Sequence, residues 1–86
     1  MFKRIILSSN ERPNSAVLLV RSIAQDYFEA VAICASIQKG QATTIFGPHT
    51  VYDLTEAGVI AEGKDWIKRQ GCTGLTEENI ETYPDY

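Results

Sequence analysis

The sequence predicts an α+β protein: a four-stranded antiparallel sheet in ββαββα order, with two helices on one face and a short C-terminal helical turn. Two observations favour this class. Segments rich in β-branched and aromatic residues alternate with segments whose apolar residues recur at helical spacing. Clusters of Gly, Pro, Asn and Ser separate these segments. The length of 86 residues predicts one domain, residues 1–86.

The first two strands are expected at residues 2–7 and 16–21, as an antiparallel hairpin around the polar loop 8–15. Residues 16–20 read Ala-Val-Leu-Leu-Val without a polar break. Successive side chains of a strand point to opposite faces. Both faces of this strand therefore carry apolar side chains.

A helix is expected next, from a capping-box variant at Asp26 and Glu29 to a glycine stop at Gly40. An alternative is one long helix over residues 15–38. The apolar stripe of the expected helix comprises Tyr27, Ala30, Val31, Cys34 and Ile37.

A second hairpin is expected at residues 42–54, turning at Gly47-Pro48-His49, with its register left open. The second helix follows over residues 55–70, capped by Asp53 or Thr55 and closed by Gly71. Gly63 lies in the apolar stripe of this helix, where a missing side chain allows another segment to approach closely.

The C-terminal segment matches a hydrophobic staple, with Leu75 before the cap, Thr76 as the cap and Ile80 one turn later. A short helical turn is therefore expected, ending before Pro84. Residues 53–86 carry eight acidic and three basic side chains, within a net charge of −3. This balance argues against nucleic-acid binding and permits binding to a basic protein surface.

The chain offers little catalytic chemistry. Its one histidine, His49, lies at the expected turn, and its two cysteines and one histidine lack zinc-site spacing. No cofactor, metal or catalytic residue is predicted. No apolar run approaches membrane-spanning length, and Cys34 and Cys72 are interpreted as reduced thiols. These features favour a cytoplasmic protein.

Every expected strand offers a large apolar residue to each face, while two helices cover only one. The other face is expected to be covered by the C-terminal segment, by a second copy or by another protein.

The function favoured is a non-enzymatic protein-binding module, an inhibitor or adaptor on a larger basic protein or nucleoprotein. An example is a phage- or mobile-element-encoded inhibitor of a host nucleic-acid machine. Alternatives are a structural homodimer and a small enzyme or ligand-binding domain using His49 with Tyr52 or Asp53. The expected partner-binding residues are Val17, Leu19, Phe46, Glu77, Glu78, Glu81, Tyr83, Asp85 and Tyr86.

Overall fold

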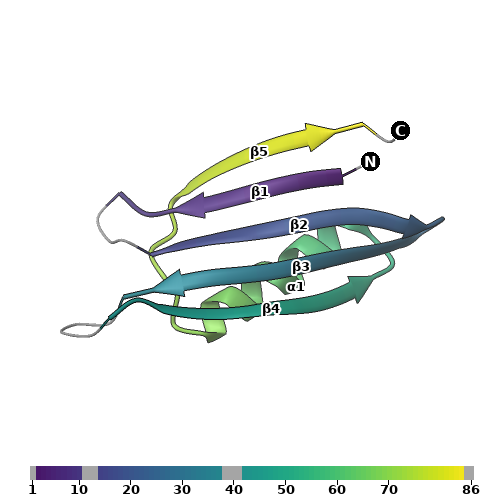
Figure 1. Ribbon diagram of the computed structural model, residues 1–86. Coiled ribbons are helices and arrows are strands. Elements are labelled where there is room, and N and C mark those ends of the chain that lie inside the picture. The colour runs from purple at the N-terminus through teal and green to yellow at the C-terminus, as the bar shows by residue number, and fades with distance from the viewer. Residues whose placement is uncertain (1, 11–13, 38–41, 85–86) are drawn as a thin grey trace.

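The computed structural model describes residues 2–10, 14–37 and 42–84. Over these residues the chain forms a five-stranded antiparallel sheet in the order β4-β3-β2-β1-β5, with one helix on one face (Figure 1). The elements are β1 (Phe2–Ser8), β2 (Ser15–Ala24), β3 (Tyr27–Ser36), β4 (Thr44–Asp53), α1 (Glu56–Arg69) and β5 (Glu77–Tyr83).

The expected first hairpin is confirmed, because β1 and β2 pair antiparallel from Phe2 opposite Arg21 to Ser8 opposite Ser15. The four-stranded ββαββα sheet with two helices is wrong. Residues 27–36, expected as a helix, form β3, which pairs with β2 on one side and β4 on the other. The alternative of one helix over residues 15–38 is wrong for the same reason, and Gly40 lies outside the described residues.

The physical reason for β3 lies in its composition. The segment is apolar at almost every position from Phe28 to Ala35, so helical and strand periods fit it equally well. The β-branched residues Val31 and Ile33 favour the strand. Asp26, expected as a helix cap, instead occupies a tight turn after Ala24 with φ of 53°, a left-handed conformation that Asp tolerates.

The expected hairpin over residues 42–54 is also wrong, because β4 runs straight through Gly47 and Pro48 as an edge strand. A bulge accommodates both residues opposite β3, where Ala32 pairs with His49 and Cys34 with Phe46. Gly47 has φ of 101°, and a Cβ there would lie 2.6 Å from the Ala32 carbonyl oxygen. Proline is tolerated at such a site because an edge strand need not donate every N–H.

The helix expected at residues 55–70 is confirmed as α1. The Oγ1 of Thr55 caps it by accepting a hydrogen bond from the Gly58 amide at 3.0 Å, and Gly71 follows its end with φ of 83°. Gly63 is buried against Leu18, and a Cβ there would lie 2.5 Å from Leu18 Cδ2. The helix thus approaches the sheet closely at the expected position.

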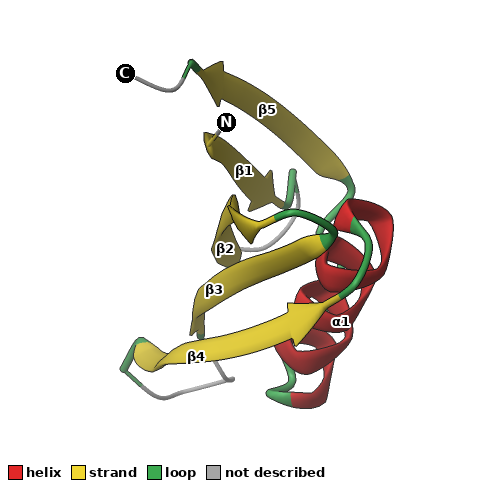
Figure 2. Ribbon diagram, turned by 90° about the vertical axis from the view of Figure 1, so that its right-hand side faces the viewer, coloured by secondary structure: helices red, strands yellow, loops and turns green. Residues whose placement is uncertain are grey.

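The hydrophobic core lies between α1 and one face of the sheet (Figure 2). The helix packs on β2, β3 and β4. Small residues of β3 leave space beneath the helix. The buried apolar residues are Ile5, Leu7, Ala16, Leu18, Val20, Ala30, Ala32, Cys34, Val59, Ile67 and Cys72.

The C-terminal helical turn is wrong, because Glu77–Tyr83 forms β5 and pairs antiparallel with β1 from Ser8 to Phe2. A hydrophobic staple stabilises only the first turn of a helix. Pairing of residues 77–83 with β1 instead gives the edge of β1 backbone hydrogen bonds along its whole length, and this effect is larger. The segment therefore extends the sheet sideways instead of folding across its second face (Figure 1).

Candidate protein-interaction surface

In the part of the chain that the structure describes, no helix packs on the sheet face opposite α1, and we call this side the open face (Figure 2). Residues directly opposite one another in neighbouring strands project to the same side, so the register defines this face. Its side chains are Phe2, Arg4, Ile6 and Ser8 of β1; Ser15, Val17, Leu19 and Arg21 of β2; Glu29, Val31, Ile33 and Ala35 of β3; Ile45, Thr50 and Tyr52 of β4; and Glu77, Asn79, Glu81 and Tyr83 of β5.

The centre of the open face is aliphatic. Ile6, Val17 and Ile33 form one row across three strands, and Leu19 and Val31 belong to the next. These five side chains are half-buried, and among the described residues no helix or strand covers them. A shallow hollow of about 350 Å³ lies beside the first of these rows, and its lining includes Ile6, Val17, Ile33 and Ile45. The surface there is apolar and slightly concave.

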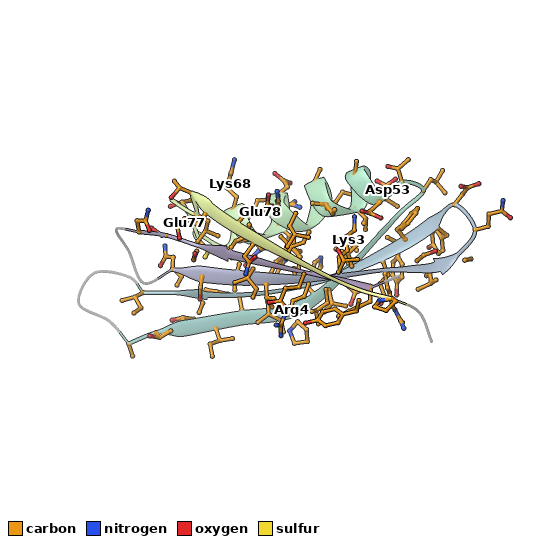
Figure 3. All side chains as sticks on the ribbon, turned by 90° about the horizontal axis from the view of Figure 1, so that it is seen from above. Lys3, Arg4, Asp53, Lys68, Glu77 and Glu78 are labelled. Atoms are coloured by element: carbon orange, nitrogen blue, oxygen red, sulfur yellow. The ribbon has the colours of Figure 1, made fainter. Side chains whose placement is uncertain are left out.

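Charged residues of the open face pair within the plane of the sheet. Arg4 Nη2 donates to Glu81 Oε2 at 2.6 Å, and Arg21 Nε donates to Glu29 Oε1 at 2.8 Å. In Figure 3, Arg4 projects from the open face and Lys3 toward α1, as alternation along a strand requires. The surface therefore carries charge at its margin without a strong net field.

Aromatic pairs flank the aliphatic centre at one end of the sheet. The Phe2 and Tyr83 ring centroids are 5.6 Å apart, and Tyr27 stacks on Tyr52 at 5.7 Å with an interplanar angle of 13°. Aromatic residues and arginine around an aliphatic centre are typical of protein–protein interfaces. The open face therefore has the composition of a binding surface.

The structure distributes the expected partner-binding residues over both sides of the sheet. Phe46 lies on the helix side and packs against the core, and Glu78 on that side bonds Lys64 of α1 at 2.6 Å. Asp85 and Tyr86 lie outside the described residues. The members brought together on the open face are Val17, Leu19, Glu77, Glu81 and Tyr83.

Four central or flanking residues of the open face were missed from the sequence: Ile6, Val31, Ile33 and Ile45. In the expected helix, Val31 and Ile33 lie on different sides, whereas in β3 they share one face. The signal that was present is the pair of β-branched residues two positions apart, the spacing of one strand face.

The residues of the enzyme alternative do not converge. His49 stacks on Trp66 of α1, with ring centroids 4.9 Å apart and an interplanar angle of 6°. Tyr52 lies on the open face, whereas Asp53 shares the helix side with His49 at about 13 Å along the strand. A hydrogen bond between the Asp53 and Glu62 carboxyls lowers the pKa of Asp53 and raises that of Glu62. This pair lies apart from the imidazole.

We expect acid to loosen the β5 edge through Glu81. Hydrogen bonds from Tyr83 and then Arg4 hold the pKa of Glu81 below its usual value. Such a carboxylate stabilises the fold above its unfolded-state pKa, and the contribution is lost as pH falls through the folded-state pKa. Protection factors from amide exchange, which compare each rate with the intrinsic rate at the same pH, should fall in β5 below about pH 4 before they fall in β3. Glu81→Gln should remove this difference between strands; an unchanged acid profile in that variant would contradict the assignment.

Both cysteines are buried free thiols in contact with one another on the helix side. Cys72 Sγ also lies 3.6 Å from the Ser15 carbonyl oxygen and 3.5 Å from that of Ala35. Burial, with a smaller contribution from Cys72, raises the pKa of Cys34 to about 11. Nucleophilic attack requires the thiolate, so Cys34 is a poor nucleophile in the folded protein.

We therefore expect Cys34 to react with an aromatic disulfide reagent at pH 8 at least roughly 100-fold more slowly in the folded than in the unfolded chain. The measurement is labelling of Cys72→Ser, in which Cys34 is the remaining thiol, with and without urea. Equal rates in the two states would contradict burial of this thiol.

Comparison with protein-family models, with curated proteins and with solved structures finds no match to this chain. Among the described residues, no three His, Cys, Asp or Glu side chains are grouped so as to hold a metal ion. Within residues 2–10, 14–37 and 42–84, no helix is both long enough and apolar enough to cross a membrane.

Proposed function

We propose that this chain is a non-enzymatic protein-interaction module that binds a further protein chain through the open face of the sheet. One observation carries the proposal. The helix covers one face, the C-terminal strand extends the sheet edge, and no described helix or strand packs over the aliphatic rows of the other face.

The size of the uncovered patch supports binding. Full burial of one large aliphatic side chain contributes about 1.5–3 kcal/mol. The five central residues are only half-buried, and Ile45 beside them is 70% exposed. Contiguous apolar patches on a protein surface mark interaction sites or aggregation-prone sites. A protein partner that covers this patch would gain the burial that the chain alone leaves unused.

The chemistry of the surface favours an apolar partner over a strongly basic one. Two of the three glutamates of β5 are neutralised within the chain, Glu78 by Lys64 and Glu81 by Arg4. Within the described residues, Glu77 is the carboxylate of β5 without an ion pair. The acidic strand therefore offers little unpaired charge, and contact with the aliphatic rows supplies most of the affinity.

A photo-cross-linking experiment tests the proposal. Benzoylphenylalanine replaces Tyr52, a half-exposed aromatic residue of the open face, or Lys68 on the exposed side of α1. In the native cell, position 52 should form a covalent adduct with a protein chain and position 68 should not. Adding Ile45→Glu should abolish the adduct. No adduct at position 52, or equal adducts at both positions, would overturn the proposal.

A further inference from the structure

We propose that the partner on the open face is a second copy of this chain, so that two sheets stack into a four-layer α/β/β/α dimer. The inference rests on the proposed function, because it names the occupant of that same surface. It follows from the area of the face, its internal charge pairing and the residues that a two-fold axis brings together.

The open face has the area that a dimer needs. Five strands spaced about 4.8 Å apart, with 7 to 10 residues in each, give a face of roughly 600–700 Å². Two copies therefore bury roughly 1,200–1,400 Å², at the lower end of stable protein–protein interfaces. Such a dimer is expected to dissociate in the micromolar range.

The charges of the open face suit a partner with the same surface. Arg4 and Arg21 are neutralised in the plane of the sheet by Glu81 and Glu29. Nucleic acid or a strongly basic protein would meet no opposing field of matching strength. A second copy meets this face without bringing an unpaired arginine into the contact.

A two-fold axis running across the strands makes the face self-complementary. This rotation exchanges the row of Leu19 and Val31 with the row of Val17 and Ile33. Leu19 then lies over the partner's Val17, and Val31 over the partner's Ile33. Aligned sheets cross at about 30°, which preserves these central contacts.

Residues at the edge of the open face are also brought against compatible residues of the partner by this axis. Tyr52 is brought toward the partner's Ile45, and Arg21 toward the partner's Ser15. An axis running along the strands would instead place Arg21 against the partner's Arg21. The axis across the strands is therefore the favoured one.

Sedimentation equilibrium over a concentration series tests the dimer with two matched variants. Ile45 on the open face is 70% exposed and Leu54 in the turn before α1 is 69% exposed, so neither supports the folded core. The apparent mass of the unmodified chain should rise through the micromolar range and approach twice the monomer mass at concentrations well above it. Ile45→Glu should raise the dissociation constant at least tenfold, while Leu54→Glu should leave it unchanged. Circular dichroism checks that both variants remain folded.

The outcomes separate this inference from the proposed function. A monomer throughout the concentration series overturns the dimer. Equal effects of Ile45→Glu and Leu54→Glu overturn the placement of the interface on the open face. If the chain is monomeric and position 52 cross-links to a different protein, the proposed function stands without the second copy. If the chain is monomeric and position 52 forms no adduct, both are rejected.

Discussion

Replacing Leu18 with alanine is expected to lower the free energy of unfolding by about 3–4 kcal/mol. The Leu18 side chain is 0% exposed and lies under α1, against Gly63. Its truncation removes apolar burial and leaves a cavity that the close-packed helix and sheet cannot fill completely. A domain of this size has a total stability of roughly 4–13 kcal/mol, so much of it would be lost. Urea unfolding followed by circular dichroism measures the change.

The contact between Leu18 and Gly63 predicts that Gly63→Ala destabilises the unmodified chain but stabilises the Leu18→Ala variant. In the unmodified chain, Gly63→Ala places a Cβ 2.5 Å from Leu18 Cδ2. The resulting overpacking, about 1–3 kcal/mol, offsets the roughly 1 kcal/mol that alanine gains over glycine in a helix. In the Leu18→Ala background the obstruction is absent, so Gly63→Ala should be stabilising. Additive effects in the double variant would contradict this contact.

The parts of the fold that were predictable from sequence have strong local signals at their boundaries. The helix α1 begins at a Thr cap and is followed by Gly71, and both signals act within one turn of chain. The first hairpin has a polar loop between two apolar segments. Thr55 and Gly71 therefore define the ends of α1 independently of tertiary contacts.

The parts that were not predictable depend on contacts between distant segments. Strand β3 is apolar at nearly every position, and only pairing with β2 and β4 separates its two faces. The staple around Thr76 is outweighed by pairing with β1, which is more than 60 residues away in sequence. Gly47 and Pro48 resemble a turn, because a bulge in an edge strand uses the same residue types.

The sequence predicts that the sheet has a second apolar face, but it does not predict which residues form that face. The unbroken run at residues 16–20 correctly indicated a strand with two apolar faces. Which residues share the second face depends on the strand register. The helix expected from Asp26 to the stop at Gly40 excludes Val31 and Ile33 from that face. Phe46 was included because the bulge that turns it to the helix side was not foreseen.

Asn14 connects three segments at one end of the sheet. Its side chain is only 4% exposed; its Nδ2 donates to the Thr73 carbonyl oxygen at 3.2 Å, and its Oδ1 accepts from the Ile37 amide at 3.1 Å. It therefore joins the start of β2 to the end of β3 and to the loop before β5. Ile37 and Thr73 both lie outside the described helices and strands.

Replacing Asn14 with leucine, which has similar volume, should therefore lower the free energy of unfolding by about 2–4 kcal/mol, because both backbone partners lose their hydrogen bonds in a buried site. Asn10→Ala is the matched control, since Asn10 is exposed and should change stability by less than about 0.5 kcal/mol. Amide exchange should accelerate at Ile37 in Asn14→Leu before it does in the centre of β3. If both variants lower the free energy of unfolding equally, the effect comes from the loop and the assignment to these two hydrogen bonds is wrong. If only Asn14→Leu lowers it, the stability comes from the two hydrogen bonds of the Asn14 side chain.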